Sequence, residues 1–393
     1  MKRTTALFVA CALLLCGCSK TEDTPEYITT PAETSSETAP VSSQAEESPY
    51  KSYAFDNLTE TEQQIYTIIA DAAKNHEKKA VFPEPVKWEI CRKAYIAVFR
   101  METDIFWLSS LLRPAEPEQL VSELYLHYDF TEEECKKMSE EIENAAADVL
   151  KKAEAMSSDY EKLKLFHDFL VLRVDFSDES DYTTGTIYGG LVGKSLKCGG
   201  YAKTIRWLCE RAGIENTIAD GESNGVSHTW NKVKCGGRWY NLDATWDDPV
   251  IKSSSIRKDT YIRYDFFLVP DSDIIGLTHT LSEEIIKSPE CTSTSENYFN
   301  KEHLCAYSAE NGIEMLKEAA IRSVKSGTAN AEVRFASKEE YDIAVKKLFD
   351  NGGITPVLKA ANAAAGGNVI SESAYARSLN SDLLIINVSF SYK

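Results

Sequence analysis

The chain has 393 residues, of which 43% are hydrophobic, and a formal net charge of −18 at pH 7. This length can hold two or three domains, and the hydrophobic content is that of an ordinary globular protein. So acidic a chain disfavours nucleic acid as a partner, and it disfavours electrostatic docking on an anionic membrane.

The first 17 residues resemble a bacterial lipoprotein signal. Lys2 and Arg3 precede a short apolar run at 6–15, and Leu15-Cys16-Gly17-Cys18 has the form of a lipobox with Cys18 as the lipidated residue. The run is too short to be a stable membrane span. We expect a protein held at the bacterial cell membrane by lipid on Cys18, outside the cytoplasm. A plain secretory signal is the alternative.

Residues 18–52 are rich in Ser, Thr, Glu and Pro, which predicts a disordered tether. From 53 to 157 the apolar spacing predicts a helical region. Two capping boxes are expected there, Asn57 with Glu60 and Thr131 with Glu134. We have no catalytic role for this region and expect it to pack against the next one.

Ser158 with Glu161 predicts another helix start, with the helix running to about Leu172. It carries His167, which we interpret as a packed structural histidine. The glycine-rich stretch 185–193 lacks the ending of a phosphate-binding loop. It lets Tyr188 approach the following segment, where Tyr188 is a candidate for the substrate cleft or for an oxyanion donor.

A helix is predicted to begin at or just before Cys198. Gly199 and Gly200 follow the cysteine, and Tyr201, Ile205 and Leu208 then recur at helical spacing up to Gly213. Unpaired N–H groups and the helix dipole favour a thiolate at such a position.

Two strands are predicted next, 226–234 and 238–246, joined by the turn Gly236-Gly237. This turn pairs residues whose numbers sum to 473, so Trp230 faces Asp243 and His228 faces Thr245. Side chains alternate along a strand, which places His228 and Asp243 on one face as diagonal neighbours. Trp230 is a second candidate for the substrate cleft.

The remaining chain offers no further catalytic group. Residues 261–269 read as another strand of the same sheet, and His279 lies in a loop-like stretch with a structural role. From 301 to 393, helices and strands alternate, which predicts a small α+β domain. Seven cysteines follow Cys18, too few for a dense disulfide framework, although Cys291 and Cys305 could pair.

The ordered set Cys198, His228 and Asp243 suits nucleophilic catalysis. The imidazole takes the thiol proton and returns it to a leaving amine, while the carboxylate orients the ring. A zinc site built from the same three residues is less favoured, because close ligand pairs such as Cys-x-x-Cys are missing. We expect neither metal nor cofactor.

Several stretches resemble the transglutaminase-like (papain-related) superfamily in its bacterial form. These are CGGYAKTIRWLCERAGI (198–214), SHTWNKV (227–233) and GRWYNLDATWDDP (237–249), with weaker support from 162–170, 187–196 and 264–274. The resemblance implies Cys198 as nucleophile, His228 as base and Asp243 as third member. It also implies an α+β core at 158–300, in which a helix bearing the cysteine packs on an antiparallel sheet.

We therefore expect a surface-anchored, cysteine-dependent acyl-transfer enzyme acting on amide bonds of protein or peptide. Access to the cleft decides between a water acceptor (peptidase) and an amine acceptor (cross-linking), and the sequence leaves this open. The alternative is a non-catalytic binding module on the same scaffold at the cell surface.

Overall fold

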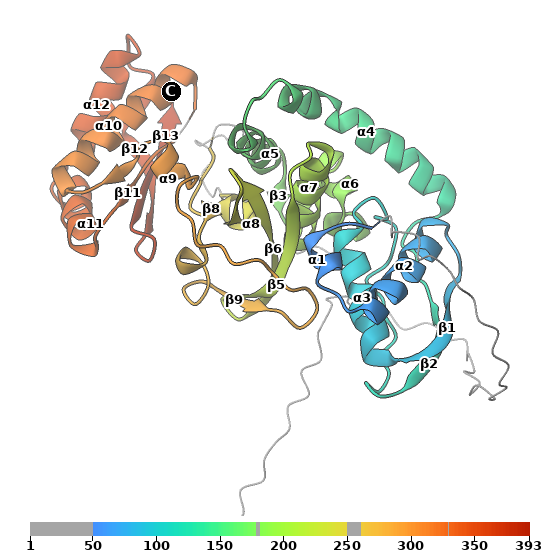
Figure 1. Ribbon diagram of the computed structural model, residues 1–393. Helices are drawn as coiled ribbons and strands as arrows, with labels where there is room; N and C mark the ends of the chain where they lie inside the picture. Colours follow the sequence, from blue (N-terminus) through green and yellow to red (C-terminus); the bar gives the residue numbers. More distant parts are fainter. Residues whose placement is uncertain (1–49, 178–180, 250–260, 329) are drawn as a thin grey trace, which may run out of the picture.

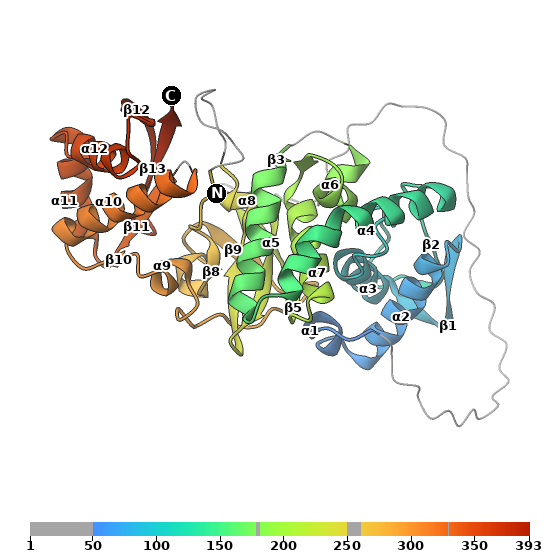
Figure 2. The ribbon, with the colours of Figure 1, turned by 90° about the horizontal axis from the view of Figure 1, so that it is seen from above.

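The computed structural model describes residues 50–177, 181–249, 261–328 and 330–393. Figures 1 and 2 show three parts in a row: N-terminal helices with a two-stranded sheet, a central five-stranded sheet with its helices, and a C-terminal four-stranded sheet with its helices. The predicted signal and nearly all of the predicted tether lie outside the described residues. The mixed α and β class expected from the sequence is confirmed.

The described N-terminal part contains three helices and an unexpected two-stranded antiparallel sheet, whose strands are separated in sequence by a helix. Its elements are α1 (Tyr53–Asp56), α2 (Glu60–Lys74), β1 (Lys79–Lys87), α3 (Trp88–Met101) and β2 (Leu120–Tyr125). The predicted box of Asn57 with Glu60 is wrong, because Thr59 and Glu62 form the capping box of α2. The strand β1 escapes a pattern search because Pro83 and Pro85 interrupt its ladder, where the register shifts.

The long helix α4 (Glu132–Glu154) joins this part to the centre. It starts with the predicted capping box of Thr131 and Glu134. Its buried face shares one hydrophobic cluster with the central helices, and Figure 2 shows it running beside α5 and α6. The helical region therefore packs on the centre, as expected, while the predicted domain borders stay predictions.

The central part is built around helix α7, which packs on strands β5 and β6. The sheet order is β8-β7-β6-β5-β9, and every neighbouring pair is antiparallel. Its elements are α5 (Asp159–Arg173), β3 (Asp175–Phe176), η1 (Tyr182–Gly185), α6 (Ile187–Leu191), β4 (Ser195–Leu196), α7 (Cys198–Arg211), β5 (Asn216–Ser223), β6 (Val226–Cys235), β7 (Arg238–Leu242), α8 (Ala244–Asp247), β8 (Phe267–Val269), η3 (Asp271–Asp273) and β9 (His279–Ser282).

Two predicted strands are shorter in the structure. The strand predicted at 238–246 ends at Leu242, because the Asp243 side chain accepts the backbone N–H groups of Thr245 and Trp246 and starts α8. Of the strand predicted at 261–269, only β8 pairs with β7. Thr245 therefore lies on a helix and does not face His228.

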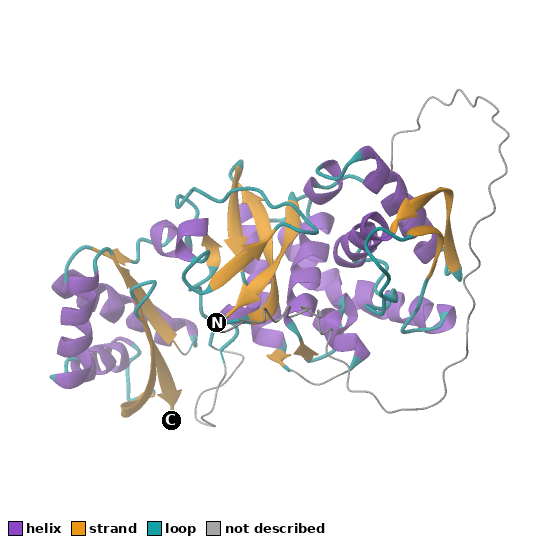
Figure 3. Ribbon diagram, turned by 90° about the horizontal axis from the view of Figure 1, so that it is seen from below, coloured by secondary structure: helices purple, strands orange, loops and turns teal. Residues whose placement is uncertain are grey.

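The C-terminal part is a four-stranded sheet in the order β10-β11-β13-β12, with helices covering one face (Figure 3). Its elements are α9 (Tyr298–Lys301), β10 (Cys305–Ala306), α10 (Ala309–Ser326), β11 (Asn330–Phe335), α11 (Lys338–Val345), the π-helical η4 (Lys346–Asp350), α12 (Ile354–Ala364), β12 (Ile370–Asn380) and β13 (Ile385–Tyr392). The edge strand β12 was not expected, since most of its side chains are polar and half-exposed or exposed.

Within the described ranges, no helix has both the length and the apolar character needed to cross a membrane.

Candidate active site

Cys198 is the first residue of α7, as the sequence predicts. Lys197 precedes it in extended conformation, and its N–H donates to the carbonyl of Thr184. Gly200 permits this close approach, because a Cβ there would lie 2.3 Å from the Thr184 carbonyl oxygen. The half-buried thiol thus lies where the helix dipole favours an anion.

His228 and Asp243 come from adjacent strands in the predicted register. The ladder of β6 and β7 pairs Cys235 with Arg238 and Asn231 with Leu242, so its residue numbers sum to 473 as expected. His228 lies on β6, and Asp243 directly follows β7. Both side chains point to one side, as the parity argument requires, with His228 Nε2 donating to Asp243 Oδ2 over 2.7 Å.

The same imidazole also acts on Cys198. The His228 side chain lies close enough to the Cys198 thiol to lower its pKa, and so does the backbone of Thr229. Since Nε2 is bonded to Asp243, Nδ1 is the ring nitrogen left for another partner. Of the three residues predicted from the sequence, the structure joins His228 to Asp243 by a hydrogen bond and places Cys198 near His228.

The charges of this group favour an ion pair. Burial raises the pKa of the Cys198 thiol, but the hydrogen bond to His228 and the charges of His228 and Arg100 outweigh it, so this pKa lies below its ordinary value. Burial lowers the pKa of His228, yet the carboxylate of Asp243 and the contact with Cys198 raise it to about 10. Both shifts favour the thiolate–imidazolium pair over the two neutral groups.

The other described cysteines have raised pKa values. Burial raises the pKa of Cys91, Cys235 and Cys291 to about 12, that of Cys135 to about 11, and those of Cys209 and Cys305 upward as well. All seven are free thiols, so Cys291 and Cys305 do not form the disulfide that the sequence left open. Among these seven thiols, only that of Cys198 has a lowered pKa.

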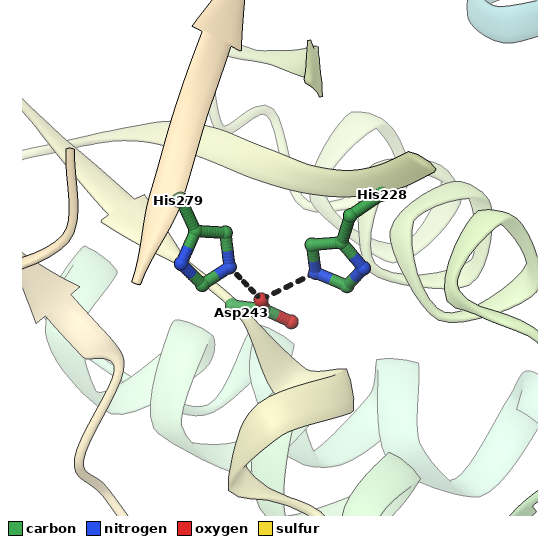
Figure 4. Close-up of side chains that lie close together, drawn as sticks. All are labelled: His228, Asp243 and His279. Carbon is green, nitrogen blue, oxygen red and sulfur yellow. Dashed lines mark hydrogen bonds and ion pairs between the residues drawn. The ribbon is translucent and has the colours of Figure 1, made fainter. Parts of the chain in front are cut away.

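His279 belongs to the same cluster, although sequence reasoning placed it in a loop. It lies on β9, which pairs with β5, and its Nε2 donates to Asp243 Oδ2 over 3.0 Å. Figure 4 shows the carboxylate between the two imidazole rings. The available signal was the run of strand-forming residues Thr278-His279-Thr280-Leu281, but nothing local pairs His279 with Asp243.

His228, Asp243 and His279 also form a possible cation site, since one ligand atom from each lies within 4.8 Å of the others. Cys198 does not belong to this set. The zinc site considered from the sequence combined Cys198 with His228 and Asp243, whereas here His279 takes the place of Cys198. The Asp243 carboxylate already accepts two backbone N–H groups on Oδ1 and two imidazole N–H groups on Oδ2. A satisfied carboxylate of this kind fits a hydrogen-bonded cluster better than a metal ligand.

The side chains of Trp230 and Tyr188, the two candidates for the substrate cleft, are hydrogen-bonded to residues other than Cys198, His228 and Asp243. Trp230 is 1% exposed, stacks beside His228 with ring centroids 6.0 Å apart, and donates from Nε1 to Asn241. It is a buried support for the imidazole. Tyr188 lies on α6, and its hydroxyl donates to Glu141 on α4 over 2.6 Å, which gives that hydroxyl a partner other than a substrate.

His167 is fully buried on α5, in agreement with the structural role expected for it. Its Nδ1 lies 3.1 Å from Asp168 Oδ1 and its Nε2 lies 3.2 Å from Asp247 Oδ2. The hydrogen bonds and charges of these two carboxylates outweigh the effect of burial and raise the pKa of His167. The remaining predicted site residue, Cys18, lies outside the described residues.

Comparison with known proteins gives distant similarities. No family model matches the chain. It is similar to the kyphoscoliosis peptidases of Mus musculus and Homo sapiens, each 23% identical over 155 residues that cover 34% of this chain and 23% of the relative. The chain thus spans less than a quarter of the length of these curated relatives.

The similarity to solved structures is low. A transglutaminase is 15% identical, with 45% of this chain and 52% of that chain covered and a TM-score of 0.27. A candidate cysteine protease from Cytophaga hutchinsonii is 19% identical, with 28% and 37% covered and a TM-score of 0.24. Likenesses of this size carry no argument, and the function has to be argued from the site.

Proposed function

We propose that this protein is a cysteine-dependent acyl-transfer enzyme of the transglutaminase-like (papain-related) type, acting on amide bonds of proteins or peptides. The observations that carry the proposal are the hydrogen bond of His228 to Asp243 and the position of Cys198 at the start of α7, where His228 lowers the pKa of its thiol. The low pKa of the thiol and the raised pKa of the imidazole give each group the protonation state that the reaction needs.

In the first half of the reaction, the Cys198 thiolate attacks the carbonyl carbon of the amide. A C–S bond forms, and the carbonyl oxygen takes the negative charge. The imidazolium of His228 then gives its proton to the amide nitrogen, the C–N bond breaks, and an amine leaves behind a thioester on Cys198.

Asp243 acts on this sequence through His228. Its carboxylate holds Nε2 and leaves Nδ1 for the thiol, so the ring keeps one orientation while its charge changes. Burial raises the pKa of Asp243, but the charge and hydrogen bond of His228 and the hydrogen bond of His279 bring it well below its ordinary value. The carboxylate therefore remains charged throughout the cycle.

The backbone N–H of Cys198 is the candidate donor for the oxyanion. As the first residue of α7, it has no acceptor within the helix, and the helix dipole favours negative charge at this point. The second half of the reaction returns the acyl group to water, or to an amine that His228 deprotonates. The first outcome is hydrolysis and the second is transamidation.

We also propose that lipid on Cys18 holds the enzyme at the outer side of the bacterial cell membrane, with the segment up to 52 as a tether. The lipobox-like sequence before Cys18 supports this. Metabolic labelling with an alkyne-bearing fatty acid should tag the full chain and lose the tag in Cys18→Ala. An untagged wild-type chain would leave a plain secretory signal as the better reading.

Alkylation of Cys198 tests the catalytic proposal. Iodoacetamide should modify Cys198 well below pH 8 and leave the other cysteines slow, with each modified peptide quantified by mass spectrometry. His228→Ala should remove this low-pH reaction. Equal and slow alkylation of Cys198 in both proteins would favour the non-catalytic binding module.

The type of acceptor needs a second experiment. The protein is incubated with a peptide library and a labelled amine, and the products are separated by mass. Cleaved peptides without label indicate hydrolysis, while labelled peptides indicate transamidation. If neither product forms although Cys198 reacts with iodoacetamide, the proposal of an amide substrate is contradicted.

A further inference from the structure

We infer that Arg100, which α3 supplies from the N-terminal part, is a positioning residue of the Cys198 site. This inference rests on the proposed function, since it gives the N-terminal part a role in forming the thiolate. Arg100 is nearly a hundred residues from the nucleophile in the sequence, and it lies in the region for which sequence reasoning found no catalytic role.

The side chain of Arg100 reaches the first turn of α7. Its Nη1 lies 3.6 Å from the place that a Cβ on Gly199 would take. Gly199 directly follows Cys198. Apart from its chain neighbours and the backbone of its own helix, no other described atom lies within 4 Å of this Cβ position. The guanidinium thus lies beside the turn that begins at Cys198.

A second contact ties Arg100 to the strand that carries the base. Its Nη2 lies 3.1 Å from Asp220 Oδ1 on β5, and the Thr229 hydroxyl donates to the same oxygen over 3.2 Å. Thr229 pairs with Asp220 across the ladder and directly follows His228. Arg100 therefore contacts the cysteine's helix and, through Asp220, the strand of the histidine.

The ion pair is not arranged for maximal stability. Arg100 Nε and Asp220 Oδ2 are buried without a hydrogen-bond partner among the described residues, so the pair is joined by a single contact. A bidentate pair would satisfy more of these atoms, and buried unsatisfied atoms cost free energy. This cost in free energy is explained if the positive charge of Arg100 stabilises the thiolate of Cys198.

Arg100 is the cation that the N-terminal part adds near the thiol. Lys203, on α7, is buried, and both burial and the charge of Arg100 bring its pKa well below its ordinary value. The groups that lower the pKa of Cys198 are His228, the backbone of Thr229 and Arg100. Among these three, only Arg100 comes from the N-terminal part.

The test is the pH at which alkylation of Cys198 by iodoacetamide is half-maximal, compared between the full-length wild type and Arg100→Met. An opposite charge close to a thiol shifts its pKa by about one unit or more, so Arg100→Met should raise this pH by roughly one unit. Arg100→Lys should recover most of the shift. Arg92→Met, on the same helix and paired with Glu284, should leave the midpoint unchanged.

A second variant, for which the midpoint should shift in the opposite direction, keeps the test valid if Arg100→Met does not fold. Asp220→Asn removes the negative charge that partly cancels Arg100, so the midpoint should fall. An unchanged midpoint in Arg100→Met or in Asp220→Asn, with melting temperatures near that of the wild type, overturns the inference. A wild-type midpoint at the ordinary thiol pKa would instead overturn the proposed function, which keeps the two failures distinct.

Discussion

His279 Nε2 and His228 Nε2 donate to the same oxygen of Asp243, over 3.0 Å and 2.7 Å. The Thr278 hydroxyl lies 2.8 Å from the other ring nitrogen of His279, Nδ1. His279 is 2% exposed and packs edge-to-face on Trp230. A buried histidine thus holds the carboxylate to which His228 is hydrogen-bonded.

We expect His279→Leu to slow the alkylation of Cys198 at pH 6.5 by about tenfold to a hundredfold, because a hydrogen bond to a charged group contributes roughly 1.5–3 kcal/mol. His279→Gln, which keeps a donor near the position of Nε2, should recover part of the rate. The control is His167→Leu, which removes another buried histidine paired with carboxylates. Equal loss in both leucine variants would indicate general destabilisation.

Stability should depend on pH through His228. The pKa of its imidazole is about 10 in the folded protein against 6.5 for the free group. Because the folded value is raised, protonation of His228 stabilises the fold fully below pH 6.5, and this contribution is lost as the pH rises to about 10. The difference in melting temperature between wild type and His228→Gln should be largest at pH 6 and narrow towards pH 10. A difference that grows with pH would contradict this sign.

The two glycines after Cys198 should respond differently to alanine. A Cβ at Gly200 would lie 2.3 Å from the Thr184 carbonyl oxygen, which requires a backbone shift, so Gly200→Ala should destabilise the fold by about 1–3 kcal/mol. At Gly199 the closest described atom is a guanidinium nitrogen at 3.6 Å. Gly199→Ala should therefore be neutral, or stabilising by up to about 1 kcal/mol through helix propensity. Urea unfolding of both variants measures this, and equal effects would refute the packing argument.

Removing metal ions should leave the site intact. The four hydrogen bonds on Asp243 satisfy the carboxylate without an ion. Dialysis against EDTA should change neither the melting temperature nor the alkylation rate of Cys198, and elemental analysis should find no stoichiometric zinc. A drop in melting temperature that zinc restores would show that His228, Asp243 and His279 hold a metal after all.

Local patterns in the sequence were enough to predict much of the site. The start of α7 at Cys198 follows from spacing and flanking glycines, and the side-by-side placement of His228 and Asp243 follows from a two-residue turn and strand parity. These features depend on residues that are close together in the sequence, so they can be predicted from the sequence alone. The end of β7 was harder, because Asp243 can continue a strand or cap a helix.

The tertiary structure alone decided which distant groups complete the site. His279 reaches Asp243 because β9 pairs with β5, and Arg100 reaches the first turn of α7 because α3 packs against the central part. Neither residue belongs to a motif, and their distances depend on how separate elements pack. Sequence thus determined the helix start at Cys198 and the shared face of His228 and Asp243, while packing determined which distant groups lie close to them.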